Sequence, residues 1–279
     1  MSAQINLVKN RIKTVSGALK ITNAMKLVST IRLQKYKNKM LANREYCFEM
    51  ENILSSVLSG LNEKDKNILK VNTETEKKLY IIVSSTLGLC GSYNYNIFDL
   101  AESKISEQDD AIILGKKGLS YFKNAKFEEI EGFSDYSSIS DETIVRNLGR
   151  FVLEAYQKGE YKEIHLIHTT FKNTIVFLAK DTLILPISDK CGENGYGPIL
   201  EPSSKELAKT LLPIYVQSSI YSRLLESEVC EQAARSNAMT SASDNAIEIL
   251  DNLKIEFNKA RQASITEQII EVVSGAKNV

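Results

Sequence analysis

Apolar residues recur every three or four positions along the first 61 residues of the chain. One heptad register holds without a break, and thirteen of its seventeen positions are apolar, where the 43% hydrophobic content of the chain would give about seven. A sustained 3.5-residue repeat is typical of a coiled-coil helix. At 1.5 Å per residue this helix would be roughly 85 Å long, so we expect much of it to project from any compact domain. The register positions are Ile5, Val8, Ile12, Val15, Leu19, Thr22, Lys26, Ser29, Leu33, Tyr36, Met40, Asn43, Cys47, Met50, Leu54, Val57 and Leu61.

Three consecutive positions of this register are polar, namely Thr22, Lys26 and Ser29. We expect the helix to turn its apolar side away from the partner helix in this stretch. One interpretation is a local stutter or a polar layer that fixes the register. The other is that the segment meets the surface of a second protein. The apolar residues that lie on other faces there are Ile21, Ala24, Met25, Leu27, Val28 and Ile31.

A second register runs through the C-terminal part of the chain, with eleven apolar positions in sixteen, and its polar break lies at Glu228, Gln232 and Arg235. Farther on, the stretch from Ile265 to Val273 is apolar on more than one face, and such a helix end needs a protein surface to enclose it. Two heptad helices at the two ends of a chain pair most simply as antiparallel strands of one coiled coil. The register positions are Leu211, Ile214, Ser218, Tyr221, Leu225, Glu228, Gln232, Arg235, Met239, Ala242, Ala246, Ile249, Leu253, Glu256, Ala260 and Ala263.

The middle of the chain changes to short apolar runs that alternate with helical patterning. This alternation predicts a mostly parallel sheet covered by helices. Helices are expected from the loop Gly88–Gly91 to about Glu107 and over residues 139–158, and Ser188–Pro213 is expected to be a loop and linker. The expected strands are Leu79–Ser84, Ala111–Leu114, Phe127–Ile130, Ile164–Thr170, Thr174–Ala179 and Leu183–Ile187.

Helix breakers are absent from most of the length of the two registers. All four prolines lie between Pro186 and Pro213, and residues 18–59 and 214–274 contain neither Gly nor Pro. No run approaches 18 apolar residues, so no direct membrane insertion is expected. The cysteines are far apart and form no C-x-x-C pair, which indicates free thiols; they are Cys47, Cys90, Cys191 and Cys230.

The zero net charge of the chain hides an asymmetry, because residues 1–44 carry ten basic side chains and no acidic one. A transit peptide, a nucleic-acid footprint and a helix face opposite acidic partners all fit that composition. The heptad register continues past residue 44, which a cleaved peptide would not need. Aromatic residues do not interleave the cations, so no nucleic-acid partner is expected.

The sequence shows no constellation for catalysis. The loop Gly88–Gly91 (GLCG) is neither G-x-G-x-x-G nor G-x-x-x-x-G-K-[ST], so no nucleotide cofactor is expected. His165 and His168 would lie on opposite faces of one strand, which disfavours a shared metal. Cys90 would need a nearby base to act as a nucleophile. We therefore expect no catalytic residue, cofactor or metal.

Three segments together carry a family resemblance. They are RIKTVSGALKITNAMKLVSTIRL (Arg11–Leu33), SSTLGLCGSYNYNIF (Ser84–Phe98), and SEVCEQAARSNAMTSASDNA continuing to FNKARQASITEQIIEVVSGA (Ser227–Ala276). Their order and spacing resemble the gamma subunit of F-type ATP synthases, the central rotor shaft, over essentially the whole chain. One departure is that Thr86 and Leu87 stand where the family usually has an Asp and a basic residue.

The resemblance implies an α/β fold class, with a long antiparallel coiled coil of N- and C-terminal helices plus a central Rossmann-like α/β domain. The expected boundaries are 1–61 for the N-terminal helix, 79–190 for the α/β domain and 205–276 for the C-terminal helix. The implied role is a non-catalytic rotor that couples rotation of the membrane ring to the catalytic subunits. An alternative is a rotor paralogue or a coiled-coil scaffold of another ATPase-driven assembly.

The resemblance also implies partners and contact residues. The partners are the alpha and beta subunits of the catalytic ring, the epsilon subunit and the membrane c-ring. The expected location is the cytoplasmic face of a bacterial cell membrane, as a peripheral subunit. The contact residues carried over from the family motifs are Met25, Lys26, Val28, Arg261, Gln262, Thr266, Ile269 and Val272.

Overall fold

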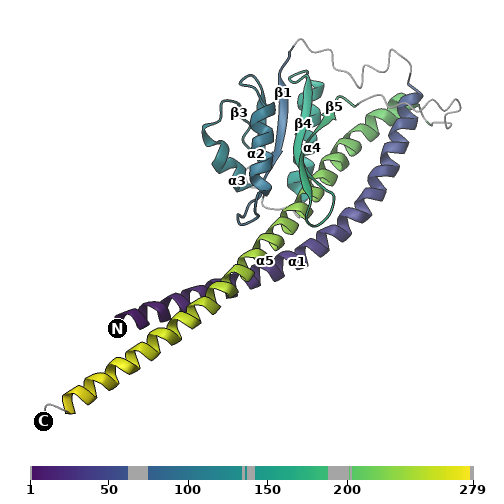
Figure 1. Cartoon of the computed structure of the whole chain (residues 1–279). Helices are drawn as coiled ribbons and strands as arrows, with labels where there is room; N and C mark the ends of the chain where they lie inside the picture. The colour runs from purple at the N-terminus through teal and green to yellow at the C-terminus, as the bar shows by residue number, and fades with distance from the viewer. Residues whose placement is uncertain are drawn as a thin grey trace. The chain divides into compact units, whose positions relative to one another are not determined.

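The computed structural model describes residues 2–61, 75–133, 136, 142–187, 201 and 203–276. It divides into two compact units: a terminal unit of Met1–Thr30 and Arg235–Val279, and a sheet unit of Ile31–Ala234. The elements in chain order are α1 (Ser2–Ser59), β1 (Lys78–Val83), α2 (Tyr93–Lys104), β2 (Asp110–Leu114), α3 (Lys116–Tyr121), a 3₁₀ turn (Phe122–Asn124), β3 (Glu128–Glu129), α4 (Glu142–Gln157), β4 (Glu163–Phe171), β5 (Phe177–Leu185) and α5 (Ser204–Ala276) (Figure 1).

Helices α1 and α5 run antiparallel within each unit. In the terminal unit the Ser243 hydroxyl reaches Thr22, and in the sheet unit the Cys47 thiol reaches the carbonyl oxygen of Ser218. In an antiparallel helix pair, the numbers of residues that face each other have a constant sum. That sum is 265 for both pairs, so both belong to the same register. All seventeen seam positions predicted for α1 are buried or half-buried, which confirms that seam.

The seam predicted for α5 is wrong in phase beyond Met239. Ile249 is 48% exposed, and Glu256 and Ala263 are exposed as well. Counted from Met239, the buried and half-buried positions follow at steps of four and then three residues. The predicted register took steps of three and then four residues from the same starting point. The seam of α5 is formed instead by Met239, Ser243, Ala246, Leu250, Leu253, Phe257, Ala260 and Ser264, all buried or half-buried.

The loop and linker predicted for Ser188–Pro213 is wrong in its last part, because α5 begins at Ser204 and holds Pro213 inside it. A proline in a helix interior removes one hydrogen bond and costs about 3 kcal/mol. Burial on the opposite side of the helix offsets that cost: Ala208, Leu212 and Val216 are at most 4% exposed and belong to the main apolar core. The glycines of the expected linker and Cys191 lie outside the described residues.

The sheet has five strands in the order β3-β2-β1-β4-β5, and only β5 is antiparallel to its neighbour. Its strands β1, β2, β3 and β4 agree with the predicted segments to within two residues at each end. The two segments predicted at 174–179 and 183–187 are one strand, β5. The strand begins only at Phe177, because residues 174–176 belong to a turn in which the side-chain oxygen of Asn173 accepts the N–H groups of Ile175 and Val176.

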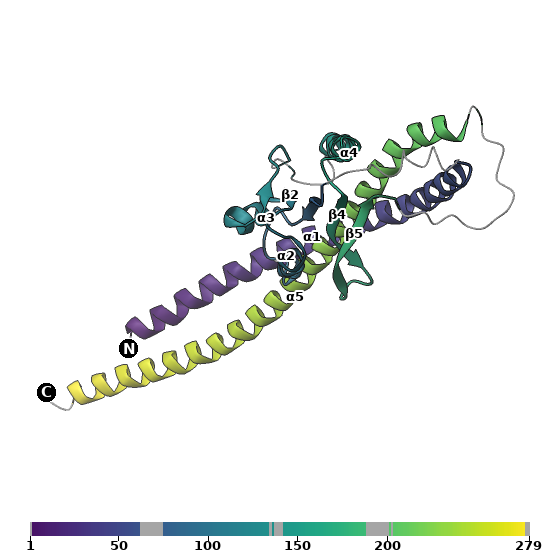
Figure 2. The same cartoon turned by 90° about the horizontal axis from the view of Figure 1, so that it is seen from above.

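Apolar layers cover both faces of the sheet. On one face α2 and the 3₁₀ turn pack on Tyr80, Ile82 and Ile113. On the other face, α4 and the sheet-unit parts of α1 and α5 pack on alternate residues such as Ile81 and Leu166. Figure 2 shows α2 and α4 on opposite sides of the strands. Helix α5 is therefore part of the core of the sheet unit, as well as a strand of the coiled coil.

Candidate interaction surfaces

The seam of the terminal unit is polar over two turns of α1. Ser29 is only 2% exposed, and Thr22 is half-buried. The Ser243 hydroxyl donates to Thr22 Oγ1 at 2.8 Å, and Thr22 in turn donates to the carbonyl oxygen of Leu19. Two turns farther along α1, the Thr30 and Ser236 hydroxyl oxygens are 3.1 Å apart at an exposed position. Hydroxyl pairs thus join the two helices here, and the buried Ser243 hydroxyl has a partner.

The apolar side chains of the same stretch of α1 point away from α5. Ile21 is 62% exposed, Leu27 63% and Val28 50%, while Met25 is half-buried. This confirms that the helix turns its apolar side away from its partner where the seam becomes polar. Contiguous exposed apolar side chains on a soluble surface mark places where another protein binds. We call Ile21, Leu27 and Val28 the outer stripe.

The last turns of α5 carry the second group of candidate residues. Arg261, Gln262 and Thr266 are exposed, and the Thr266 hydroxyl donates only to the carbonyl of Gln262 in its own helix, among the hydrogen bonds of the described residues. Beyond them, Ile269 is 58% and Val272 71% exposed. Further exposed apolar side chains lie close by: Ile265 and Val273 are one turn from Ile269 on nearly the same face, and Ile270 lies on another face of the helix.

The structure keeps the two groups of candidate residues apart. The α1–α5 register places Lys26 level with Met239, and Arg261 lies 22 residues farther along α5. At 1.5 Å per residue that is about 33 Å. Met25, Lys26 and Val28 therefore form one patch of the terminal unit, and Arg261, Gln262, Thr266, Ile269 and Val272 form another.

Cations precede the first patch along α1. Lys9, Arg11, Lys13 and Lys20 of α1 are all exposed within the terminal unit, and Lys26 is half-buried. No acidic residue precedes residue 45 in the sequence. This part of α1 therefore presents a positive surface that attracts acidic partners at a range set by the ionic strength.

The carboxyl edge of the sheet is the place where doubly wound folds bind ligands. Strand order reverses between β1 and β4, and the crevice at that point is filled by α5. A cavity of about 10 Å³ remains, which has room for a single water molecule. Its lining residues are Val83, Ser84, Thr86, Tyr93, Tyr136, Leu224, Ser227, Glu228 and Glu231.

The GLCG loop at that edge is fixed by hydrogen bonds within the sheet unit. Asn94 at the start of α2 accepts the N–H of Ser85 at 3.0 Å and donates to the Ser85 hydroxyl at 2.7 Å. Thr86 donates to the carbonyl oxygen of Tyr136. Leu89 has a φ of 62°, a left-handed conformation that non-glycine residues seldom adopt, and its side chain is 63% exposed. The loop therefore presents the apolar side chains of Leu87 and Leu89 to its outer side.

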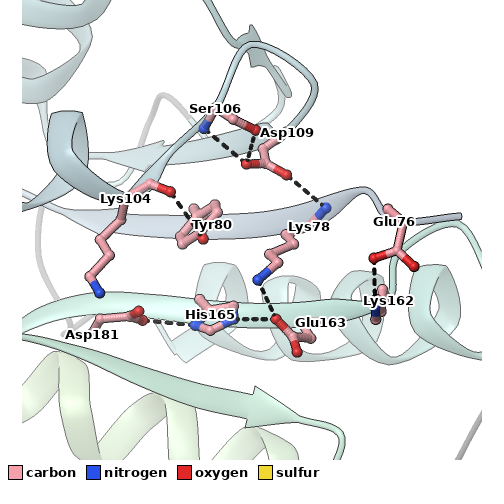
Figure 3. A network of polar contacts seen from close by, with 10 residues as sticks. All are labelled: Glu76, Lys78, Tyr80, Lys104, Ser106, Asp109, Lys162, Glu163, His165 and Asp181. Atoms are coloured by element: carbon pink, nitrogen blue, oxygen red, sulfur yellow. Dashed lines mark hydrogen bonds and ion pairs between the residues drawn. The ribbon is translucent and has the colours of Figure 1, made fainter.

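The two histidines of β4 have different surroundings. His165 lies between Asp181 and Glu163, 2.9 and 3.2 Å from them, and Glu163 also pairs with Lys78 (Figure 3). Burial alone would lower the pKa of His165, but the hydrogen bonds to the two carboxylates outweigh it and raise the pKa. His168 Nε2 lies 3.0 Å from the Thr182 hydroxyl, and burial with the charge of Arg223 lowers its pKa to about 3.

Comparison with known proteins decides the family. The ATP synthase family model matches residues 4–279. The ATP synthase gamma chain of Mycoplasmopsis pulmonis is 36% identical over 96% of this chain and 97% of its own length. The chain belongs to the ATP synthase gamma chain family. The gamma chain of Ureaplasma urealyticum is 33% identical, over 98% of this chain and 99% of its own length.

Solved structures agree with this gamma chain fold. A chain in the cryo-EM structure of the Euglena gracilis mitochondrial ATP synthase, with OSCP, F1 and c-ring, has a TM-score of 0.65 at 15% identity, and the match covers 99% of this chain and 95% of that chain. A chain of the Tetrahymena thermophila central stalk and c-ring has a TM-score of 0.59 at 24% identity, over 80% and 99%. These likenesses confirm the expected fold class, with two long terminal helices and a sheet-containing middle.

Two polar residues of this gamma chain were missed by the sequence analysis. Glu228, Gln232 and Arg235 were predicted to form a polar break in the seam of α5. The neighbouring Glu226 and Ser227 accept hydrogen bonds from backbone N–H groups at the end of β4. Burial raises the pKa of Glu226, against the effect of the backbone N–H that it accepts. The signal in the sequence was that polar residues gather on more than one face of α5 at this point.

Proposed function

We propose that this chain is the central rotor subunit of a proton-translocating F-type ATP synthase. It couples rotation of the membrane ring to the conformational cycle of the catalytic subunits. The observation that carries the proposal is the inverted amphipathicity of α1 in the terminal unit, where a hydroxyl-lined seam faces α5 and the outer stripe faces outward. A helix pair that served only as a scaffold would bury that stripe between its own helices.

The contact residues of this rotor are divided between two levels. Met25, Lys26 and Val28 contact the catalytic ring at one level, and Arg261, Gln262 and Thr266 contact it at the other. Ile269 and Val272 turn within an apolar collar of the ring. The rotor contributes no catalytic residue of its own, since ATP synthesis and hydrolysis take place in the catalytic subunits.

The partners of the rotor follow from the same assignment. The coiled coil lies inside the ring of alpha and beta subunits, and the α/β domain contacts the epsilon subunit and the membrane c-ring. The domain boundaries proposed are 1–61, 79–190 and 205–276. The chain is a peripheral subunit at the cytoplasmic face of a bacterial cell membrane. Across the described residues, no helix combines the length and the apolar character that a bilayer span requires.

Smooth charge attraction guides the rotor without locking it, because long-range electrostatic attraction varies little with angle whereas an interdigitated interface resists turning. Replacing Lys26 and Arg261 together by Gln should lower the protons pumped per ATP hydrolysed by about twofold or more in inverted vesicles. A matched control, Lys116→Gln with Lys123→Gln, removes the same charge from exposed positions of the sheet unit, outside both groups of contact residues.

Copurification tests the assignment itself. The tagged chain should carry with it catalytic subunits in a ring, with one copy of the chain per ring, and should stimulate their ATP turnover. A chain that copurifies with no ATPase ring would contradict the rotor. Unchanged pumping in the Lys26/Arg261 variant would contradict only the contact residues.

A further inference from the structure

Strand β4 extends past the end of its neighbour β1. The parallel pairing of these strands ends at Ile82 and Ile167, but β4 continues to Phe171. In residues 168–171, the backbone N–H and C=O groups that point toward the β1 side of the strand therefore have no β1 residue to pair with. A buried backbone N–H without a partner is costly, so these groups need acceptors from elsewhere in the fold.

Helix α5 supplies those acceptors from two consecutive residues. The Ser227 hydroxyl accepts the N–H of Thr169 at 3.1 Å, and Glu226 Oε1 accepts the N–H of Phe171 at 2.9 Å. The Cys230 thiol lies 3.6 Å from the carbonyl oxygen of Thr169. Ser227 is 1% exposed and Cys230 is fully buried. The side chains of α5 thus take the place of a strand at the open edge of β4.

These contacts differ in kind from the apolar packing around them. Leu224, Leu225 and Val229 fill the neighbouring core, and apolar contacts tolerate sliding because they have no preferred direction. A hydrogen bond weakens steeply when its angle is bent. Bonds that leave α5 sideways toward the end of a strand therefore resist rotation of the sheet about the helix axis.

The geometry points to Glu226 and Ser227 as the joint that fixes the α/β domain to the shaft helix and carries torque between them. This inference rests on the rotor function proposed above. The two residues are positioning residues, because they hold the sheet against α5 and touch no reacting group. We call them the β4 clamp.

A single-molecule measurement on the assembled ATP synthase tests the β4 clamp. The catalytic ring is fixed to a surface, and a bead is attached to the α/β domain at a cysteine that replaces the exposed Lys123. The variance of the bead angle is recorded while the enzyme waits for ATP. We expect the Glu226→Ala, Ser227→Ala double variant to widen this variance about twofold, with the unloaded ATP hydrolysis rate unchanged.

Conservative and matched variants separate the clamp from a general loss of stability. Glu226→Gln keeps an acceptor oxygen for the N–H of Phe171 and should retain the variance of the parent. Ser222→Ala and Glu206→Ala make the same chemical changes elsewhere on α5 and should also leave it unchanged. Hydrogen exchange of the Thr169 and Phe171 amides should accelerate in the double variant.

The possible outcomes are distinct. A bead that does not rotate on the parent enzyme would overturn the rotor function. A rotating parent, with an unchanged variance in the double variant, would overturn the clamp alone. If the double variant does not assemble, the single variant Ser227→Ala, which removes one oxygen atom, replaces it. A wider bead-angle variance and faster exchange of the Thr169 amide would then support the clamp, and no change in either would overturn it.

Discussion

The Ser243 hydroxyl donates a 2.8 Å hydrogen bond to Thr22 Oγ1, across the seam between the two ends of the chain. Residues 221 positions apart in the sequence are joined in this way. Ser243 is 3% exposed, so the bond lies in the interior of the helix pair. Hydroxyls of this size let the helix backbones approach closely while their polar atoms remain paired.

Replacing Thr22 with Val keeps the shape of the side chain and removes the acceptor of Ser243. We expect a loss of about 1 kcal/mol in the free energy of unfolding. The double variant Thr22→Val, Ser243→Ala should recover part of that loss, because no hydroxyl is then left unpaired. Urea unfolding of the full chain measures both, with the exposed Thr14→Val as the control. Additive losses in the double variant would contradict a direct bond.

The outer stripe should be dispensable for folding. Val28→Ser and Leu27→Ser change side chains that are 50% and 63% exposed, and we expect each to shift the unfolding free energy by less than about 0.5 kcal/mol. In the assembled enzyme the same variants should lower the ATP turnover that the rotor stimulates. Ala18→Ser, on another exposed position of α1, is the control. A large loss of stability in the isolated chain would show that the stripe is part of its core.

Two glycines should respond to alanine in opposite directions. A Cβ at Gly17 in α1 would meet nothing within 4 Å, so Gly17→Ala should stabilise the chain by about 0.5–1 kcal/mol. A Cβ at Gly118 would lie 2.6 Å from the Ser84 hydroxyl and 2.7 Å from Ile113, and Gly118→Ala should destabilise it by about 1–3 kcal/mol. Thermal unfolding of the two variants gives the signs directly, and equal signs would contradict the packing at Gly118.

His165 should make stability depend on pH as the pH rises above about 6.5. Its folded pKa is raised by Asp181 and Glu163, so its stabilisation is complete below the unfolded value of about 6.5 and is lost as pH rises through the folded pKa. The difference in unfolding free energy between the parent and His165→Gln should therefore be larger at pH 6 than at pH 9. His168, with its pKa lowered to about 3, has the opposite sign and should destabilise the native state as pH falls below about 6.5. Imidazole titration by NMR distinguishes the two residues.

The seam of α1 could be predicted from the sequence because large apolar residues stand at most of its positions, so the few polar ones did not obscure the phase. In α5 the buried position is Ser243, whereas Ile249 lies outside the seam at 48% exposure. A prediction that places apolar residues in the seam assigns Ile249 to it and leaves Ser243 out. Only the hydroxyl of Thr22 on the other helix makes Ser243 a favourable seam residue, and a pairing between distant segments is not visible in either segment alone.

The candidate surfaces could be predicted in part for a related reason. The outer stripe is a local property of α1, and the polar break at Lys26 revealed it. The β4 clamp depends on where β1 ends relative to β4, which is a property of the folded sheet. Pro213 was likewise assigned to a linker because local propensity predicts a helix end there, whereas the buried side chains of Ala208 and Val216 sustain the helix.

The central claim is that this chain turns inside a catalytic ring. The most direct test fixes the assembled ring and follows a bead on the α/β domain, at a cysteine replacing Lys123, while ATP is hydrolysed. The account predicts stepwise rotation in one direction that stops when ATP is withdrawn. Steady ATP hydrolysis by rings that contain the chain, with a bead that shows no net rotation, would contradict it.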